Sequence, residues 1–285
     1  MTSTDPRNSP AVYPESTSVL RELDELGVLL VSWNRPERNN GWCQEIEDAY
    51  FGTLIAAAND PNVKVIVVTG VGKSFCPGVD ISTLESRAKG EPVGQYPRRW
   101  PMTLARLIPK PVIAAVNGAC AGIGFVQLVS TDIRFASHAA KFTTAFSRRG
   151  LPAENGLSWI LPRLIGSGHA ADLLLSARVI DATEALSIGL INRLVTPDEL
   201  LSAALSYARE MAINCSPSAM ADIKHQLLSD WDLTAEESRL RSLVLMSEAG
   251  TRPDFAEGVF SFIEKRAPVF TGLDAELRVN KAINR

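Results

Sequence analysis

The stretch from Pro111 to Asp132, PVIAAVNGACAGIGFVQLVSTD, limits the possible folds more than any other part of this sequence. Its first part, 111–116, is a continuous apolar run rich in Val, Ile and Ala, which predicts a strand covered on both faces. Asn117-Gly118 is a turn signal. A helix is expected to open directly afterwards, from about Ile123 to Ser130. The stretch therefore predicts a buried strand, a tight turn and a helix, as in an α/β sheet.

Three glycines in this turn, Gly118, Gly122 and Gly124, allow the backbone to approach a neighbour closely. A helix that begins on glycines presents unpaired N–H groups and the positive end of its dipole. Such a site can hold a phosphate, or an oxyanion that forms only during a reaction. The spacing GxxxGxG differs from the dinucleotide fingerprint GxGxxG, and no Gly-Lys-Ser/Thr follows. A tightly packed strand–helix corner would use the same glycines, so both interpretations stay open at this point.

Length and charge exclude several classes of protein. The 285 residues suffice for one large domain, or for one domain with an added subdomain. The net charge of −3 does not favour nucleic acid or an anionic membrane surface as a partner. No apolar run approaches the roughly 18 residues of a membrane span. The four scattered cysteines form no CxxC pair and the three histidines lack a metal-type spacing, so we expect reduced thiols, no metal site and a cytoplasmic location.

Strand and helix patterns alternate over the first two thirds of the chain, whereas the last third is helical. Strands are expected at 19–22, 28–34, 63–69, 111–116, 133–137, 141–144 and 191–195. Helices are expected at 42–59, 101–107, 123–130, 158–165, 169–176, 181–188, 198–214, 216–229, 234–247 and 252–266. Residues 85–100 are polar, contain several Gly and Pro, and are expected to form a loop. This order predicts an α/β core followed by an α-helical C-terminal subdomain.

Four segments together resemble the crotonase superfamily, also called the enoyl-CoA hydratase/isomerase family. They are SFCPGVDI at 74–81, AVNGACAGIGFVQL at 115–128, the segment 132–166, and RPDFAEGVFSFIEKRAPVFTG at 252–272. The resemblance covers roughly residues 17–272. It implies an α/β fold in which β-β-α units form a spiral, with a C-terminal helical subdomain that packs on neighbouring subunits. The expected division is a flexible arm at 1–16, the spiral core at 17–202 and an oligomerisation subdomain at 203–285.

The resemblance also implies a chemistry. Members of the family bind acyl-coenzyme A thioesters, and two backbone N–H groups hold the thioester oxygen, which becomes an enolate during the reaction. By position these donors match Val79, in Gly78-Val79-Asp80, and Ile123, in Gly122-Ile123-Gly124. Coenzyme A is expected as part of the substrate, with no permanently bound cofactor. A homotrimer or a dimer of trimers is the expected assembly.

The acid–base residue is the point at which this sequence departs from the hydratase branch of the family. That branch uses two glutamates, and the matching positions here are Val126 and Phe146. Glu154 remains nearby. Its setting resembles peroxisomal-type Δ3,Δ2-enoyl-CoA isomerases, which carry a single catalytic glutamate eight residues before a proline, as Glu154 precedes Pro162. A second reading makes Glu154 only an acid at a helix N-terminus. Asp80 is expected to be a helix N-cap.

Other candidate residues concern the substrate. Arg38 and Lys265 resemble positions at which relatives contact coenzyme A, Lys265 from a neighbouring subunit. Trp100 is a candidate for lining the acyl pocket, together with Val126 and Phe146.

Three functions are therefore compared. The first is enolate-type proton transfer on an acyl-CoA, with Δ3,Δ2 isomerisation ahead of hydration. The second is another crotonase-type reaction, such as thioester hydrolysis, dehalogenation or decarboxylation. The third is a non-catalytic or RNA-binding relative, and the acidic balance without a basic stripe argues against it.

Overall fold

The computed structural model describes residues 12–91 and 99–273 of the chain. Its larger sheet has six strands in the order β1-β2-β3-β5-β7-β10. These strands are β1 (Val19–Leu23), β2 (Val28–Trp33), β3 (Val65–Gly70), β5 (Val112–Val116), β7 (Ile133–Ser137) and β10 (Arg193–Val195). β1 and β2 form the expected antiparallel hairpin, and the other neighbours in this sheet are parallel.

A second, smaller sheet has four strands in the order β4-β6-β8-β9. They are β4 (Ser74–Cys76), β6 (Ala119–Ala121), β8 (Lys141–Thr143) and β9 (Ile180–Asp181). The first three are parallel, and β9 closes the sheet in the antiparallel sense.

The two sheets are built by a repeating unit. In each of the pairs β3-β4, β5-β6 and β7-β8, the first strand enters the larger sheet and the second enters the smaller one. A helix follows each pair: α2 (Ile81–Ala88), α3 (Ile123–Val129) and α4 (Leu157–Ile165). This arrangement confirms the predicted spiral of β-β-α units. It also places the segments that follow β4, β6 and β8 side by side, because these strands are neighbours.

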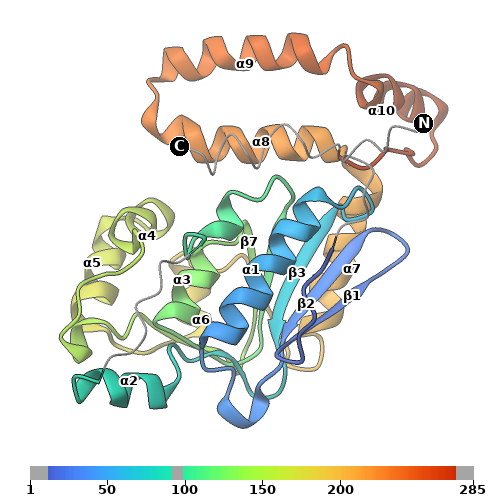
Figure 1. Cartoon of the computed structure of the whole chain (residues 1–285). Coiled ribbons are helices and arrows are strands. Elements are labelled where there is room, and N and C mark those ends of the chain that lie inside the picture. The colour runs from blue at the N-terminus through green and yellow to red at the C-terminus, as the bar shows by residue number, and fades with distance from the viewer. Residues whose placement is uncertain (1–11, 92–98, 274–285) are drawn as a thin grey trace, which may run out of the picture.

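Both faces of the larger sheet are covered (Figure 1). Ile66 and Val68 of β3 pack with α1 (Gln44–Asn59) and α3 in one apolar cluster. Val65 and Val67 lie on the opposite face and pack with α7 (Leu200–Asn214) in a second cluster. Successive side chains of a strand point to opposite faces, so a wholly apolar strand requires cover on both sides.

The chain continues through helices that extend away from the sheets (Figure 1). α7 falls within the expected C-terminal subdomain, yet it packs on the larger sheet. Beyond it lie α8 (Pro217–Ser229), α9 (Ala235–Ala249) and α10 (Pro253–Glu264). No residue of α9 is buried, and large apolar side chains of α9 and α10 are exposed. They are Leu240, Leu243, Val244, Met246, Phe255, Val259, Phe260, Phe262 and Ile263.

Three local expectations are corrected. The loop expected at 85–100 is partly helical, because α2 continues to Ala88. The helix expected at 101–107 is only a short 3-10 helix, Leu104–Arg106. The expected tight turn after β5 contains the strand β6, whose backbone pairs with both β4 and β8.

Other expectations concern the ends of the chain and its surroundings. Residues 1–11 of the expected N-terminal arm lie outside the described residues, whereas the Tyr13 hydroxyl donates a hydrogen bond to Asp60. All four cysteines are free. Among the described helices, none combines the length and apolar character needed to cross a membrane. The remaining helices are α5 (Ser167–Ser176) and α6 (Ala182–Ser187), with 3-10 helices at Pro36–Arg38, Ser147–Arg149 and Asp230–Asp232.

Candidate active site

The first element of the site is the turn after β4, which contains Gly78 and Val79. Gly78 has a φ of +113°, a backbone conformation that residues other than glycine rarely adopt. Trp42 fixes the turn by a single parallel bridge: its N–H donates to the Gly78 carbonyl at 2.7 Å, and its carbonyl accepts from the Asp80 N–H at 2.9 Å. The bridge uses the groups on either side of the Val79 N–H and leaves that N–H unengaged.

The second element is the turn from β6 into α3. Gly122, the N-cap, has a φ of +51°, and its N–H donates to the Thr143 carbonyl at 3.3 Å. A Cβ on Gly124 would lie 2.0 Å from the carbonyl oxygen of Cys76. Only glycine fits there, since the start of α3 rests directly on the end of β4. This contact explains Gly124, and it brings the two turns together.

Val79 and Ile123 are the residues that these turns present. Neither of their N–H groups donates a hydrogen bond to another described residue. Ile123 is the first residue of α3, so its N–H belongs to the unpaired donors of a helix start. Two backbone donors thus remain available on neighbouring turns, which is the arrangement that a developing oxyanion requires.

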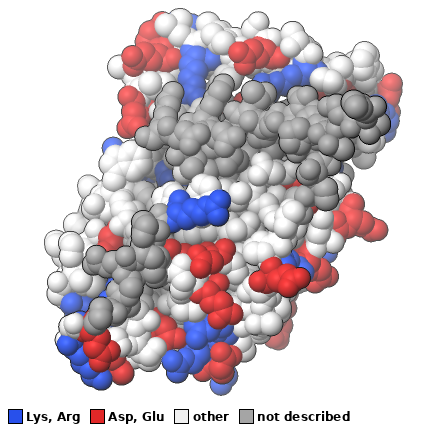
Figure 2. Space-filling model, viewed as in Figure 1, with Lys and Arg blue, Asp and Glu red and all other residues white. Residues whose placement is uncertain are grey.

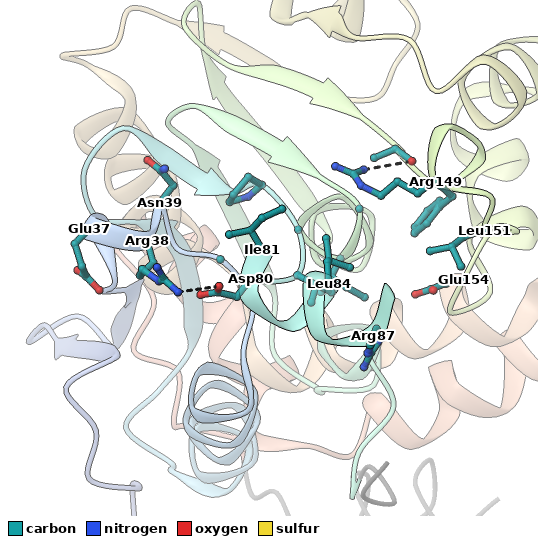
Figure 3. A pocket seen from close by; sticks show the side chains of 18 residues that line it. Glu37, Arg38, Asn39, Asp80, Ile81, Leu84, Arg87, Arg149, Leu151 and Glu154 are labelled. Atoms are coloured by element: carbon teal, nitrogen blue, oxygen red, sulfur yellow. Dashed lines mark hydrogen bonds and ion pairs between the residues drawn. The ribbon is translucent and has the colours of Figure 1, made fainter. Parts of the chain in front are cut away.

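Both residues line one cavity of about 390 Å³ (Figure 3). Its other walls come from the 3-10 helix after β2, from α2, and from the segment between β8 and α4. The lining residues are Glu37, Arg38, Asn39, Gly41, Pro77, Gly78, Val79, Asp80, Ile81, Leu84, Arg87, Gly122, Ile123, Ala145, Phe146, Arg149, Leu151 and Glu154.

Glu154 lies in the loop that leads into α4, and it is half-buried. Its backbone carbonyl accepts a hydrogen bond from the Leu157 N–H at 3.0 Å. Its carboxylate has no hydrogen bond or ion pair with another described residue. Asn155 and Gly156 follow with positive φ angles of 54° and 75°, so the chain turns sharply before the helix. Because the Glu154 carboxylate has no described partner and Glu154 lines the cavity, the carboxylate is available to a ligand there.

Asp80 differs from Glu154 because its carboxylate is fully engaged. It accepts hydrogen bonds from the N–H and hydroxyl of Ser82, which confirms it as the N-cap of α2. It also pairs with Arg38 at 3.2 Å and with Arg35 at 3.4 Å. Burial would raise the pKa of Asp80, but the bonds from Ser82 and the two guanidinium charges outweigh it and hold that pKa below its usual value. Asp80 therefore holds the Arg38 guanidinium in position through a charged hydrogen bond.

The structure brings together five of the candidate residues in this cavity: Val79, Ile123, Arg38, Phe146 and Glu154.

Three other candidates lie outside its lining. Val126 is fully buried in α3, and Trp100 follows the undescribed segment 92–98 and packs against the core. Lys265 comes directly after α10, at the opposite end of the molecule from α2 (Figure 1). Within the described ranges, no group of three or more His, Cys, Asp or Glu residues is suited to hold a metal ion.

Helix α2 contributes side chains that sequence reasoning missed. Ile81, Leu84 and Arg87 line the cavity, and they recur at the three-residue spacing of one helix face. The expected N-cap at Asp80 was a signal for this helix. The Gly and Pro residues between 90 and 97 favour a loop instead, so the sequence predicts a loop from residue 85 onward.

Comparisons of the sequence and of the structure with known proteins match nearly the whole chain to members of one family. Residues 24–273 match the sequence model of a family described as Enoyl-CoA hydratase/isomerase. The chain is 32% identical over 254 residues to the 1,2-epoxyphenylacetyl-CoA isomerase of Escherichia coli K12, covering 87% of this chain and 96% of that protein. It is 34% identical over 264 residues to the probable enoyl-CoA hydratase EchA12 of Mycobacterium tuberculosis, covering 89% and 92%. The crystal structure of a putative enoyl-CoA hydratase/isomerase from Mycobacterium abscessus superposes with a TM-score of 0.82 at 31% identity, covering 90% and 100%.

Proposed function

Since this chain belongs to the enoyl-CoA hydratase/isomerase family and is an enzyme of the crotonase superfamily, we propose that it moves the double bond of an enoyl-CoA thioester from C3 to C2. Glu154 is the acid–base residue of this proposal, and the Val79 and Ile123 N–H groups form its oxyanion hole. The observation that carries it is that one cavity holds both unengaged donors and a half-buried carboxylate without a described partner.

The reaction requires one carboxylate that acts twice. The Glu154 carboxylate removes a proton from C2 of the 3-enoyl thioester. The electron pair of that C–H bond forms a C1=C2 bond, and the carbonyl pair moves to the oxygen, which gives a dienolate whose oxygen accepts hydrogen bonds from the two backbone donors. The C3=C4 pair then takes the same proton at C4, while the C1=C2 pair shifts to form C2=C3 and the carbonyl bond re-forms. This gives the 2-enoyl thioester and restores the carboxylate. Donors placed where charge develops typically contribute about 10²–10³ in rate each.

Hydration is the second candidate, and the names of several relatives favour it. It requires a water molecule that is held and activated, normally by two acids. Val126 and Phe146 occupy the positions that match the hydratase glutamates, and neither side chain can transfer a proton. Phe146 also adds an apolar wall to the cavity. The residues of this site therefore favour the proton shift.

Coenzyme A is proposed to lie along the side of the cavity that contains Arg38. The Arg38 guanidinium is about half exposed and can bind a phosphate, while Asp80 orients this guanidinium. Lys265 lies far from the cavity of its own chain, so a contact with coenzyme A would come from a neighbouring subunit. The exposed apolar residues of α9 and α10 support a contact between subunits, and the proposed assembly is a trimer or a dimer of trimers.

No nucleic-acid partner is proposed. On the face shown in Figure 2, the Lys and Arg residues that the structure describes are interspersed with Asp and Glu and form no continuous stripe. A cytoplasmic location and the absence of a permanently bound cofactor stay predictions.

An activity screen tests the proposal. The purified protein is incubated with 3-hexenoyl-CoA and with 2-hexenoyl-CoA, and both reactions are followed by mass and ultraviolet absorbance. We expect 3-hexenoyl-CoA to acquire the absorbance of the conjugated thioester without a change in mass. A gain of one water by 2-hexenoyl-CoA at a comparable rate would instead identify a hydratase. No turnover of either thioester would indicate another crotonase-type reaction.

A further inference from the structure

Ala145 has a φ of +64°, in the left-handed region that glycine adopts freely and alanine does not. It lies two residues after the end of β8 and lines the cavity, and only 6% of its surface is exposed. A glycine here would avoid the clash between Cβ and the backbone. Strained residues of this kind gather at functional sites, so an alanine in the cavity wall suggests a use for its methyl group.

Hydrogen bonds hold the backbone of Ala145 in this conformation on both sides. Its N–H donates to the Thr143 hydroxyl at 3.2 Å, and its carbonyl accepts from the Arg149 guanidinium at 3.3 Å (Figure 3). The Thr143 hydroxyl in turn donates to the Ala177 carbonyl at 2.9 Å, which ties the turn to the end of α5. Because both polar backbone groups of Ala145 are engaged, a ligand in the cavity meets its carbon atoms.

Strand pairing places Ala145 near the second oxyanion donor. Thr143, the last residue of β8, is in register with Ala121 of β6, and its carbonyl accepts a hydrogen bond from the Gly122 N–H at 3.3 Å. Gly122 directly precedes the Ile123 donor, and Ala145 follows Thr143 by two residues. The two chain segments therefore leave the smaller sheet side by side and line the same cavity.

The next step rests on the proposed function, which places the first acyl carbons in this part of the cavity. The thioester oxygen lies at the N–H groups of Val79 and Ile123, and C2 lies within reach of the Glu154 carboxylate. Ala145 lines the cavity together with these three residues, and it belongs to the same segment between β8 and α4 as Glu154. A methyl group fixed in this wall leaves less room beside C2 and C3 than a glycine would.

We propose that Ala145 is a specificity-determining residue whose methyl group excludes branched acyl chains, so that the preferred substrates are CoA thioesters without a branch at C2 or C3. A methyl branch on the substrate would have to displace a wall that hydrogen bonds hold on both sides of Ala145. Forcing an extra carbon into a closely packed wall is unfavourable, so a single methyl group suffices for selection.

Binding of saturated thioesters tests this proposal without any reaction. Dissociation constants are measured by calorimetry for butanoyl-CoA, 2-methylbutanoyl-CoA and 3-methylbutanoyl-CoA. We expect at least one branched thioester to bind the wild type about tenfold more weakly than butanoyl-CoA, and Ala145→Gly to reduce that difference to about threefold or less. Branched thioesters that bind the wild type as tightly as butanoyl-CoA would overturn the proposal. A variant that keeps the full discrimination would do the same.

Ala177→Gly is the matched control. Ala177 also has a positive φ, of 44°, and it is buried, but it does not line the cavity. Both glycine variants should unfold at or above the urea midpoint of the wild type, because glycine adopts this conformation without strain. Only Ala145→Gly should lose the discrimination between branched and straight chains.

Two results with these variants would contradict the role of the methyl group. A lower urea midpoint for Ala145→Gly would show that alanine is not strained at this position. Equal loss of discrimination in Ala177→Gly would attribute the selection to the placement of the turn and not to the Ala145 methyl group.

The two proposals fail separately. A protein that isomerises 3-hexenoyl-CoA but binds branched and straight thioesters equally well keeps the proposed function and loses the role of Ala145. A protein that rejects a branched thioester, accepts it in Ala145→Gly and isomerises no 3-enoyl-CoA keeps the role of Ala145 and loses the proposed reaction.

Discussion

Trp42 and Val79 pair through a single parallel bridge in which the Val79 N–H takes no part. The Trp42 N–H bonds to the Gly78 carbonyl, and the Trp42 carbonyl bonds to the Asp80 N–H. The turn is therefore held on both sides of a donor that remains available. Trp42 itself is buried, and its indole N–H donates to Glu47 at 3.0 Å. A rigid support of this kind lets a backbone N–H stabilise charge without rearranging during the reaction.

Removal of the second donor should reduce turnover without unfolding α3. Ile123 is the first residue of the helix, where proline is well tolerated and the N–H is unpaired. We expect Ile123→Pro to lower kcat by about 10²–10³. Ile123→Val is the matched control, because it has a similar size and keeps the N–H, and it should retain activity within about tenfold. Steady-state kinetics on an enoyl-CoA measure both, and wild-type turnover by Ile123→Pro would exclude this donor.

Glu154→Gln should abolish most of the proton transfer. The amide keeps the size and polarity of the side chain but cannot accept the proton, so we expect turnover to fall by about 10²–10⁴. Affinity for a saturated acyl-CoA should change little. Glu37→Gln is the control, since Glu37 lines the same cavity at its other end and should lose less than about threefold. Full isomerase activity in Glu154→Gln would show that another group carries the proton.

Asp80→Asn should lower the free energy of unfolding by about 1–2 kcal/mol at pH 7. Asparagine can still cap α2, but the pairs with Arg35 and Arg38 lose their charge. The pKa of Asp80 is depressed in the folded state, so its contribution is present above the unfolded pKa of about 3.9 and is lost as the pH falls through the folded pKa. Urea denaturation between pH 7 and pH 3 should therefore show the wild type and the variant converging in acid.

Asp198→Asn removes an exposed carboxylate and is the control for that experiment. It should leave the stability within about 0.5 kcal/mol at every pH. A difference between wild type and Asp80→Asn that stays constant down to pH 3 would mean that the charge of Asp80 does not matter.

The exposed apolar residues of α9 should be buried between subunits. Leu240, Leu243 and Val244 lie on one side of the helix, and Leu243 is 55% exposed in the isolated chain. Sedimentation at micromolar concentration should show a trimer or a dimer of trimers. Leu243→Glu should shift the distribution to smaller species, whereas Asp198→Asn, at an exposed position outside α9, should not. A well-folded monomeric wild type would contradict this prediction.

The sequence by itself determined the strands of the larger sheet and the two turns of the site. Apolar runs such as 111–116 specify buried strands because a strand covered on both faces tolerates no polar alternation. Gly124 marks a close approach, since a Cβ there would meet the carbonyl of Cys76, and Gly122 suits the positive φ of the turn. Asp80 as an N-cap and Glu154 before a helix were also visible locally. These features depend on neighbouring residues alone, and the structure agrees with them.

Only the tertiary structure decided which of these residues share a cavity. Val79, Ile123 and Glu154 come from three different units of the spiral, and they line one cavity because β4, β6 and β8 are neighbours in the smaller sheet. Strand order depends on the packing of the whole chain, so local sequence patterns do not reveal it. The same reason explains why Val126, a candidate for the acyl pocket, is instead enclosed in the core: every residue of α3 is buried, because other elements cover the helix on all sides.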